Sequence, residues 1–342
     1  MPAPPVLASV WRGDICEARL RGHVAVVDAT GAVLAALGDA GAVTTLRSCV
    51  KPIQAVPFVR DALDQIGAEQ DELAVACGSH NGEPRHVATV RRLLGRVGLD
   101  DAALACGPQP PFDEASARRL FAQGEEPGAV HNNCSGKHAA MLATCVVRGW
   151  RIDGYIAPDH PCQQAVTAAL AEAMGPGLMT APRAVDGCGL PTYAMPLSTL
   201  AAAFASSQAD PAFGRCQDAM AARPFMVAGT GRFDTALLDA AGDRLTCKIG
   251  GAAVWVAAIR PKGPAVALKL EAGGDGVAPV AVAVLQRLGV LGSQLPEGLR
   301  EFATSPLRNW ARRVVGETRA EASVIGALTA PVPGHIVRSG QC

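Results

Sequence analysis

"GHVAVVDATGAVLAALG", residues 22 to 38, decides how the fold begins. Apolar residues alternate or run continuously on both sides of the segment from Asp28 to Gly31. That segment carries the Asp, Thr and Gly that favour tight turns, and the flanking pattern is typical of strands. The sequence therefore predicts an N-terminal β-hairpin.

Strand-like segments return only towards the other end of the chain, in "TCKIGGAAVWVAAI" (246–259) and "AVALKLEAG" (265–273). The region between the two ends reads mainly as helices and loops, with helical patterns at residues 83–98, 135–149 and 160–175, and a further helix is predicted at 277–291. We therefore expect an α/β (α+β) fold, in which one antiparallel sheet from both chain ends is covered by helices. A helical lobe is expected over about residues 52–225.

Neither a repeat nor a low-complexity linker divides the chain. We therefore interpret residues 1–300 as a single folded unit and residues 301–342, which are more polar, as a C-terminal extension without an assigned role. The Gly- and Pro-rich end, "TAPVPGHIVRSGQC" (329–342), is expected to form an arm or a loosely held end.

Charge and hydropathy exclude several classes of function. Lys plus Arg and Asp plus Glu both number 31, so the balance is neutral and gives no electrostatic footprint for nucleic acid. The stretch "MPAPPVLASVWRGDICEARL" does not resemble a secretory signal, and the longest apolar runs are too short to cross a bilayer. We expect a cytoplasmic protein with no membrane association.

The eleven cysteines are spread along the chain without any C-x-x-C pair. A chain of this length does not require disulfides for stability. Most of the cysteines are therefore interpreted as small buried hydrophobic residues.

The stretch "RSCVKP" (47–52) places a serine and a lysine three residues apart where a helix is expected to begin. At that spacing Ser48 and Lys51 lie on the same helix face, about 5 to 6 Å apart between Cβ atoms. A neutral lysine can activate a serine nucleophile, and a neighbouring cation such as Arg47 favours the neutral amine. The alternative is a serine that caps the helix and a solvated lysine.

Two other stretches bring reactive residues to the ends of apolar segments. Ser79 and His80 follow the run "LAVACG", and Lys248 lies at the edge of a predicted strand in "TCKIGG". Ser79 could equally cap the helix that follows it.

Cysteine, lysine and histidine occur together in "HNNCSGKHAAM" (131–141), and "DGCGLP" (186–191) supplies another cysteine. The spacing allows Cys134, Lys137 and His138 to share one helix face. Cys134 and Cys188 could provide two thiolates for zinc, although two unrelated thiols would give the same pattern.

Taken in order, several stretches resemble the L-asparaginase II family of the rhizobial type. They are "RSCVKP", "SHNGEPRH", "NCSGKHAAML", "PDHPCQ", "DGCGLPTYAMPL", "MVAGTGRFDTALL" and "KIGGAA", which cover the chain from about residue 10 to 290. The resemblance implies a serine β-lactamase-like fold, a homodimer, and hydrolysis of L-asparagine to L-aspartate and ammonia.

The resemblance also implies roles for individual residues. Ser48 with Lys51, and Ser79 with Lys248, correspond to two catalytic Ser-Lys pairs. Cys134, Lys137 and Cys188 correspond to the ligands of one zinc ion, which we expect to orient the site without generating the nucleophile. Arg47, His138 and Asp186 are expected near the substrate, Arg47 for its α-carboxylate and Asp186 for its ammonium.

The expected mechanism is attack by Ser48, with Lys51 as the base, followed by hydrolysis of the acyl-enzyme. Whether Ser48 or Ser79 is the attacking serine stays open.

Two alternative functions also stay open. One is a broader amidase that acts on glutamine or β-lactams, although S-D-N and K-T-G partner motifs are missing. The other is a zinc-binding regulator without catalytic activity, which would require a broken Ser-Lys pair.

Overall fold

The computed structural model describes residues 3–329, which divide into two compact units. Of the described residues, the first unit contains 3–45, 195–206 and 249–329, and the second contains 46–194 and 207–248. The chain therefore passes from one unit to the other four times, and two of these crossings lie within strands, β6 (Pro191–Pro196) and β7 (Leu245–Gly250).

A mixed α/β arrangement with an antiparallel sheet organises the first unit. Its strands run in the order β10-β11-β1-β2-β9-β8, with β3 also paired to β2. Their bounds are β1 Val6–Arg12, β2 Ile15–Val27, β3 Val33–Leu37, β8 Val254–Ile259, β9 Ala265–Leu270, β10 Thr304–Arg308 and β11 Val314–Ala320. The predicted hairpin is confirmed as β2 and β3, in which Val24 pairs with Leu37 and Val27 with Val33.

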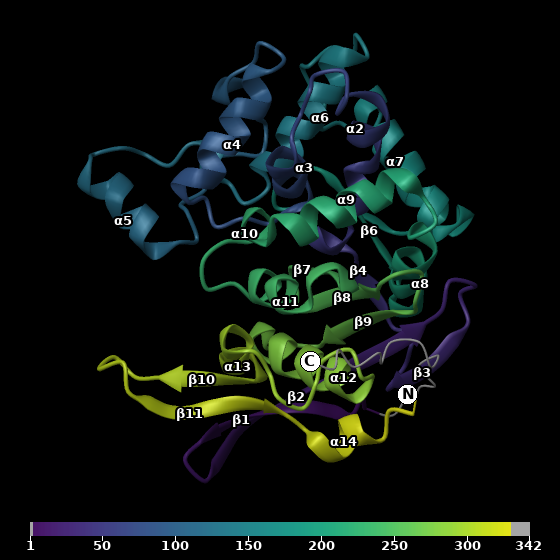
Figure 1. Ribbon diagram of the computed structural model, residues 1–342, viewed down its shortest axis with the longest axis vertical. Coiled ribbons are helices and arrows are strands. Elements are labelled where there is room, and N and C mark those ends of the chain that lie inside the picture. Colours follow the sequence, from purple (N-terminus) through teal and green to yellow (C-terminus); the bar gives the residue numbers. More distant parts are fainter. Residues whose placement is uncertain (1–2, 330–342) are drawn as a thin grey trace, which may run out of the picture. The chain divides into compact units, whose positions relative to one another are not determined.

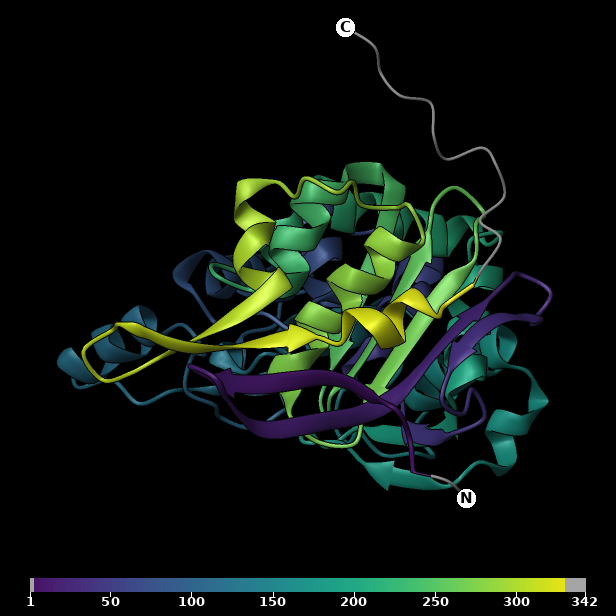
Figure 2. The same ribbon diagram turned by 90° about the horizontal axis from the view of Figure 1, so that it is seen from below.

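Both ends of the chain contribute to this sheet, as predicted. The second half of β2 pairs with β9, and β1 pairs with β11, where Ala8 lies opposite Ala320. Figure 2 shows the purple N-terminal strands beside the yellow C-terminal strands. The sequence predicted no helix or strand for residues 304–320, but this segment contains two strands of the sheet, β10 and β11.

Helix α12 (Val277–Arg287) packs on β1, β8, β9 and β11 and buries an almost continuous apolar face. The predicted helix at 277–291 is therefore confirmed. The remaining elements of this unit are β4 (Val43–Thr45), α8 (Leu197–Ser207), α13 (Glu297–Ala303) and α14 (Ala322–Gly326).

The second unit is mainly helical. Its helices are α1 (Lys51–Gln54), α2 (Val56–Asp61), α3 (Gln70–Cys77), α4 (Pro84–Gly95), α5 (Glu114–Ala122), α6 (Ser135–Val147), α7 (Pro161–Met174), α9 (Pro211–Ala222), α10 (Pro224–Val227) and α11 (Phe233–Ala241). Helix α3 contacts α1, α4, α6, α9 and α10, and Leu73 to Cys77 are buried. Figure 1 shows α3 among α4, α6 and α9. Gly136 allows α6 to approach α3, because a Cβ atom there would lie 2.3 Å from the Val75 carbonyl oxygen.

The middle of the chain contains β structure that the sequence did not predict. Strand β5 (Arg183–Val185) pairs with β6, and Arg183 lies opposite Tyr193. Such short strands give too few residues for a recognisable alternation. Among residues 3–329, no helix is long and apolar enough to span a membrane. The proposed C-terminal arm, except Thr329, lies outside the described residues.

Candidate active site

All ten residues that the sequence proposed for the site belong to the second unit. Two of its loops run together: the Ser79 N–H donates to the Val227 carbonyl oxygen at 2.8 Å, and the Asn81 N–H donates to that of Ala228 at 2.8 Å. Gly78 permits this approach, because a Cβ atom there would lie 2.7 Å from the Val227 carbonyl oxygen. The glycine before Ser79 therefore fixes where the serine enters the site.

Lys51 is fully buried on α1. Its Nζ donates to the carbonyl oxygens of Gly78 at 2.6 Å and Asn133 at 3.2 Å. Burial lowers the pKa of Lys51 to about 8, and the positive charges of Lys137 and Lys248 act in the same direction against an opposing effect of Cys134. Lys51 therefore has the environment of a lysine that loses its proton near neutral pH.

Ser48 is half-buried in a short 3-10 helix, η1 (Arg47–Val50), directly before α1. The N-cap residues of η1 and α1 are Leu46 and Val50, and neither helix has a side-chain cap. The helix-cap alternative for Ser48 is therefore wrong. In the described part of the chain, no hydrogen bond joins the Ser48 hydroxyl to Lys51, although the two residues lie in consecutive short helices.

Arg47 and Asp186 form an ion pair, with 2.7 Å between Nε and Oδ1. The same carboxylate oxygen accepts the Gly187 N–H at 2.8 Å. Arg47 also has a φ of 47°, a left-handed backbone that is rare for residues other than glycine. The ion pair uses Nε of Arg47 and Oδ1 of Asp186. Within residues 3–329, the terminal guanidinium nitrogens of Arg47 and Oδ2 of Asp186 have no hydrogen-bond partner, so these atoms are free to bind a ligand.

The sulfurs of Cys134 and Cys188 face each other, and Lys137 Nζ lies 3.4 Å from the Cys188 sulfur. All three side chains are buried. The contact with Cys188 lowers the pKa of Cys134 well below its usual value, and the contact with Cys134 raises that of Cys188. Burial opposes the charge on Lys137, but the charges of Cys188, Cys134 and Asp186 together raise its pKa.

This donor set fits a zinc ion. With ordinary Zn–S and Zn–N lengths, a tetrahedral angle puts sulfur and nitrogen ligands about 3.6 Å apart, close to the separation between Cys188 and Lys137. Zinc would displace protons from the sulfur and from the amine. Among the described residues, no three His, Cys, Asp or Glu side chains gather at one place, so Lys137 would be the third ligand.

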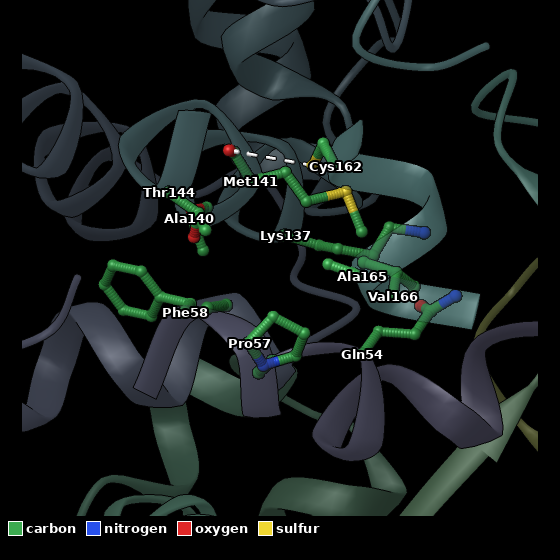
Figure 3. Close-up of a pocket in the computed structure, with 12 residues that line it drawn as sticks. Gln54, Pro57, Phe58, Lys137, Ala140, Met141, Thr144, Cys162, Ala165 and Val166 are labelled. Carbon is green, nitrogen blue, oxygen red and sulfur yellow. Dashed lines mark hydrogen bonds between the residues drawn. The ribbon is translucent and has the colours of Figure 1, made fainter. Parts of the chain in front are cut away.

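The stem of Lys137 lines a small cavity of about 10 Å³ between α1, α2, α6 and α7. Figure 3 shows Lys137, Met141 and Gln54 at one end of this cavity and Phe58 with Thr144 at the other. Such a volume is about the room that one water molecule needs, so the aliphatic stem is closely packed. This packing holds the amine in place at the Cys188 sulfur.

His138 is fully buried, and its Nδ1 lies 2.6 Å from the Tyr155 hydroxyl. That hydroxyl already accepts the Ala105 N–H, so its own proton is available for Nδ1. Burial lowers the pKa of His138 well below its usual value, so the ring is neutral. With Nδ1 as the acceptor of the Tyr155 proton, the ring proton is assigned to Nε2. Within the described residues Nε2 has no partner.

Lys248 is buried on β7 and pairs with the buried carboxylate of Asp234, with 3.3 Å between Nζ and Oδ2. The Cys49 thiol donates to the Lys248 carbonyl oxygen at 3.3 Å, which ties β7 to η1. The buried Ser79 hydroxyl has no partner in the part of the chain that is described, so the second Ser-Lys pair is not closed by a hydrogen bond. Asp234 was missed from the sequence, although it lies in the quoted stretch "MVAGTGRFDTALL".

His80, which the sequence left open, has a structural role. It accepts the Gly82 N–H at Nδ1, and its Nε2 lies 3.0 Å from the Ser135 hydroxyl, which donates to the Val130 carbonyl oxygen. Burial lowers the pKa of His80 well below its usual value. The N-cap of α4 is Glu83, so Ser79 does not cap that helix.

Comparison with known proteins shows which family model the sequence matches. The sequence model of the L-asparaginase II family matches residues 8–320. A search of curated proteins finds no match. The matched region contains every residue of the site described above.

Proposed function

Because the chain belongs to the L-asparaginase II family, we propose that it is an amidohydrolase that converts L-asparagine to L-aspartate and ammonia. The observation that carries the proposal is the buried Lys51 one turn after Ser48, inside the region matched by the family. The serine β-lactamase-like form of the fold is part of the same proposal.

Lys51 is suited to be the general base for Ser48. A neutral amine has two N–H groups and one lone pair. The carbonyl oxygens of Gly78 and Asn133 take the two N–H groups, which leaves the lone pair for the serine proton. Catalytic hydrogen bonds are often long without substrate and shorten when it binds. This accounts for the missing hydrogen bond between Ser48 and Lys51.

The reaction then has two steps. Lys51 removes the proton of Ser48 as its oxygen attacks the side-chain carboxamide; the C–N bond breaks, and the proton leaves with the nitrogen as ammonia. Water hydrolyses the resulting ester, with Lys51 as base for the water, and L-aspartate is released. Ser79 and Lys248 would assist by positioning groups around the reacting carbonyl.

Arg47 and Asp186 would recognise the amino-acid end of the substrate. The terminal nitrogens of Arg47 suit an α-carboxylate, and Oδ2 of Asp186 suits an α-ammonium. Their mutual ion pair holds both groups in place before the substrate arrives. The neutral His138 would offer Nε2–H as a further donor in this region.

Zinc, when bound by Cys134, Lys137 and Cys188, would supply a positive charge that orients the surrounding loops and the substrate. The homodimer rests on the family resemblance, and the cytoplasmic location stays a prediction from the sequence. Light scattering after size-exclusion chromatography would give the subunit number.

The experiment that tests the function measures ammonia release from L-asparagine and L-glutamine, and the absorbance change of a chromogenic β-lactam, for wild type and Ser48→Ala. We expect asparagine to be preferred and Ser48→Ala to be inactive with unchanged zinc content. Turnover of glutamine or of the β-lactam in preference to asparagine would favour the broader amidase. Zinc and asparagine binding without ammonia release would favour the regulator.

A further inference from the structure

The two lysines of the proposed Ser-Lys pairs have different electrostatic surroundings. Lys51 donates to two neutral carbonyl oxygens and lies near the Cys134 sulfur, whereas Lys248 lies against the carboxylate of Asp234. Asp234 is the second residue of α11, and neither its side chain nor that of Lys248 is exposed to solvent. Equivalent chemistry at the two lysines is therefore not expected.

A buried carboxylate stabilises the charged form of a lysine beside it. Transfer of either charge alone into the interior is unfavourable, and the two charges offset each other only when both are present. A neutral Lys248 would leave the carboxylate of Asp234 without the charge it pairs with. The pair is therefore most stable as ammonium and carboxylate.

The other groups around the pair leave this conclusion unchanged. Burial raises the pKa of Cys49 on η1 and of Cys247 on β7, so both thiols are neutral. Lys51 and Arg232 also act on this region; Lys51 is neutral or positive and Arg232 is positive, so neither of them favours an ammonium at Lys248. Of these neighbours, Asp234 is the one that favours an ammonium at Lys248.

We propose that Asp234 is a positioning residue that holds Lys248 as an ammonium, so that Lys248 acts as a charged hydrogen-bond donor and not as a second base. The inference rests on the proposed hydrolysis. In that reaction, a fixed ammonium stabilises the negative charge that develops on the carboxamide oxygen during attack. Ser79 would then be a hydrogen-bonding group and not a nucleophile activated by Lys248.

The charge of Lys248 is measurable without any turnover. The chain contains five lysines, so protein labelled with ¹³C and ¹⁵N at lysine gives a simple spectrum in which Nζ and Cε shifts separate ammonium from amine. Lys248→Arg assigns the signal. We expect an ammonium in the wild type at pH 7.5, and an amine at Lys248 in Asp234→Asn, which keeps the shape of the side chain.

The exposed Asp239 on the same helix provides the matched control. Asp239→Asn should leave the Lys248 signal and the activity unchanged, and Asp234→Glu should restore the ammonium signal. An amine at Lys248 in the wild type, or an ammonium that persists in Asp234→Asn, would overturn the proposal. If Asp234→Asn does not fold, the wild-type signal alone decides.

Kinetics give the second readout. We expect Asp234→Asn to lower kcat on the order of 100-fold with little change in KM, and Asp234→Glu to recover part of the loss. An unchanged kcat would contradict the role in catalysis. If the wild type releases no ammonia, the proposed function fails, and the lysine spectrum still decides whether Asp234 fixes the charge of Lys248.

Discussion

Lys51 donates a 2.6 Å hydrogen bond to the carbonyl oxygen of Gly78, the residue that precedes Ser79. The base proposed for one serine is thereby fixed to the backbone of the other. This contact explains why the stretches "RSCVKP" and "CGSHNGEPRH" have to meet, although the sequence separates them by a helical region.

The activity should increase with pH through the pKa of Lys51. A general base works only in its neutral form, and burial lowers this pKa to about 8. The rate with saturating asparagine should therefore rise as the pH increases towards about 8 and level off above it. Ammonia release measured from pH 6 to 10 tests this, and a rate that falls over that range would contradict the assignment. Lys51→Met should abolish turnover at every pH.

Gly78→Ala should destabilise the protein. The new Cβ atom would lie 2.7 Å from the Val227 carbonyl oxygen, so the two loops would have to separate, at a cost of about 1 to 3 kcal/mol. Gly95→Ala is the control, because this helical glycine has open space around it and should gain up to about 1 kcal/mol. Urea unfolding of both variants gives the comparison; equal stabilities would show that the close approach is unimportant.

Removal of the Arg47 side chain should weaken substrate binding. Arg47→Ala loses the proposed partner of the α-carboxylate, and a charged hydrogen bond of this kind corresponds to about a 10- to 100-fold rise in KM. Arg91→Ala removes an ion pair with Asp101 instead and should leave KM unchanged. Steady-state kinetics of the two variants test the role, and an unchanged KM in Arg47→Ala would remove Arg47 from the site.

Zinc content should depend on the two facing cysteines. Cys188→Ser and Cys134→Ser each remove a sulfur ligand and should purify with little zinc, whereas Cys16→Ser, in the first unit, should keep the wild-type content. Elemental analysis by mass spectrometry measures this directly. Full zinc occupancy in Cys188→Ser would place the ion elsewhere.

The sequence predicted the parts of the fold whose residue patterns are long. The hairpin at 22–38 is confirmed, and the helix predicted at 277–291 is confirmed over residues 277–287, because each has a clear apolar periodicity. The cysteines of the described residues are free, and all but Cys16 are buried, as composition predicts. Strands β10 and β11 were missed because their residues are mostly exposed or half-buried and show little apolar alternation.

The family resemblance, and not residue spacing, brought the site residues together. Asp234 was not predicted as a site residue, because a single acidic residue at the start of a helix usually indicates a favourable interaction with the helix dipole. Its pairing with Lys248 depends on how β7 and α11 fold together, which no local pattern reveals. The same holds for Tyr155, whose contact with His138 joins two segments that share no motif.

Identification of the acylated residue tests the central claim most directly. Wild-type protein mixed with asparagine and quenched rapidly in acid would be digested and mapped by mass spectrometry. The proposed mechanism predicts an aspartyl ester on Ser48, and this ester should be absent from Ser48→Ala. Its amount should increase under conditions that slow the hydrolysis of the ester. An ester on Ser79, or turnover with no covalent intermediate on either serine, would contradict it.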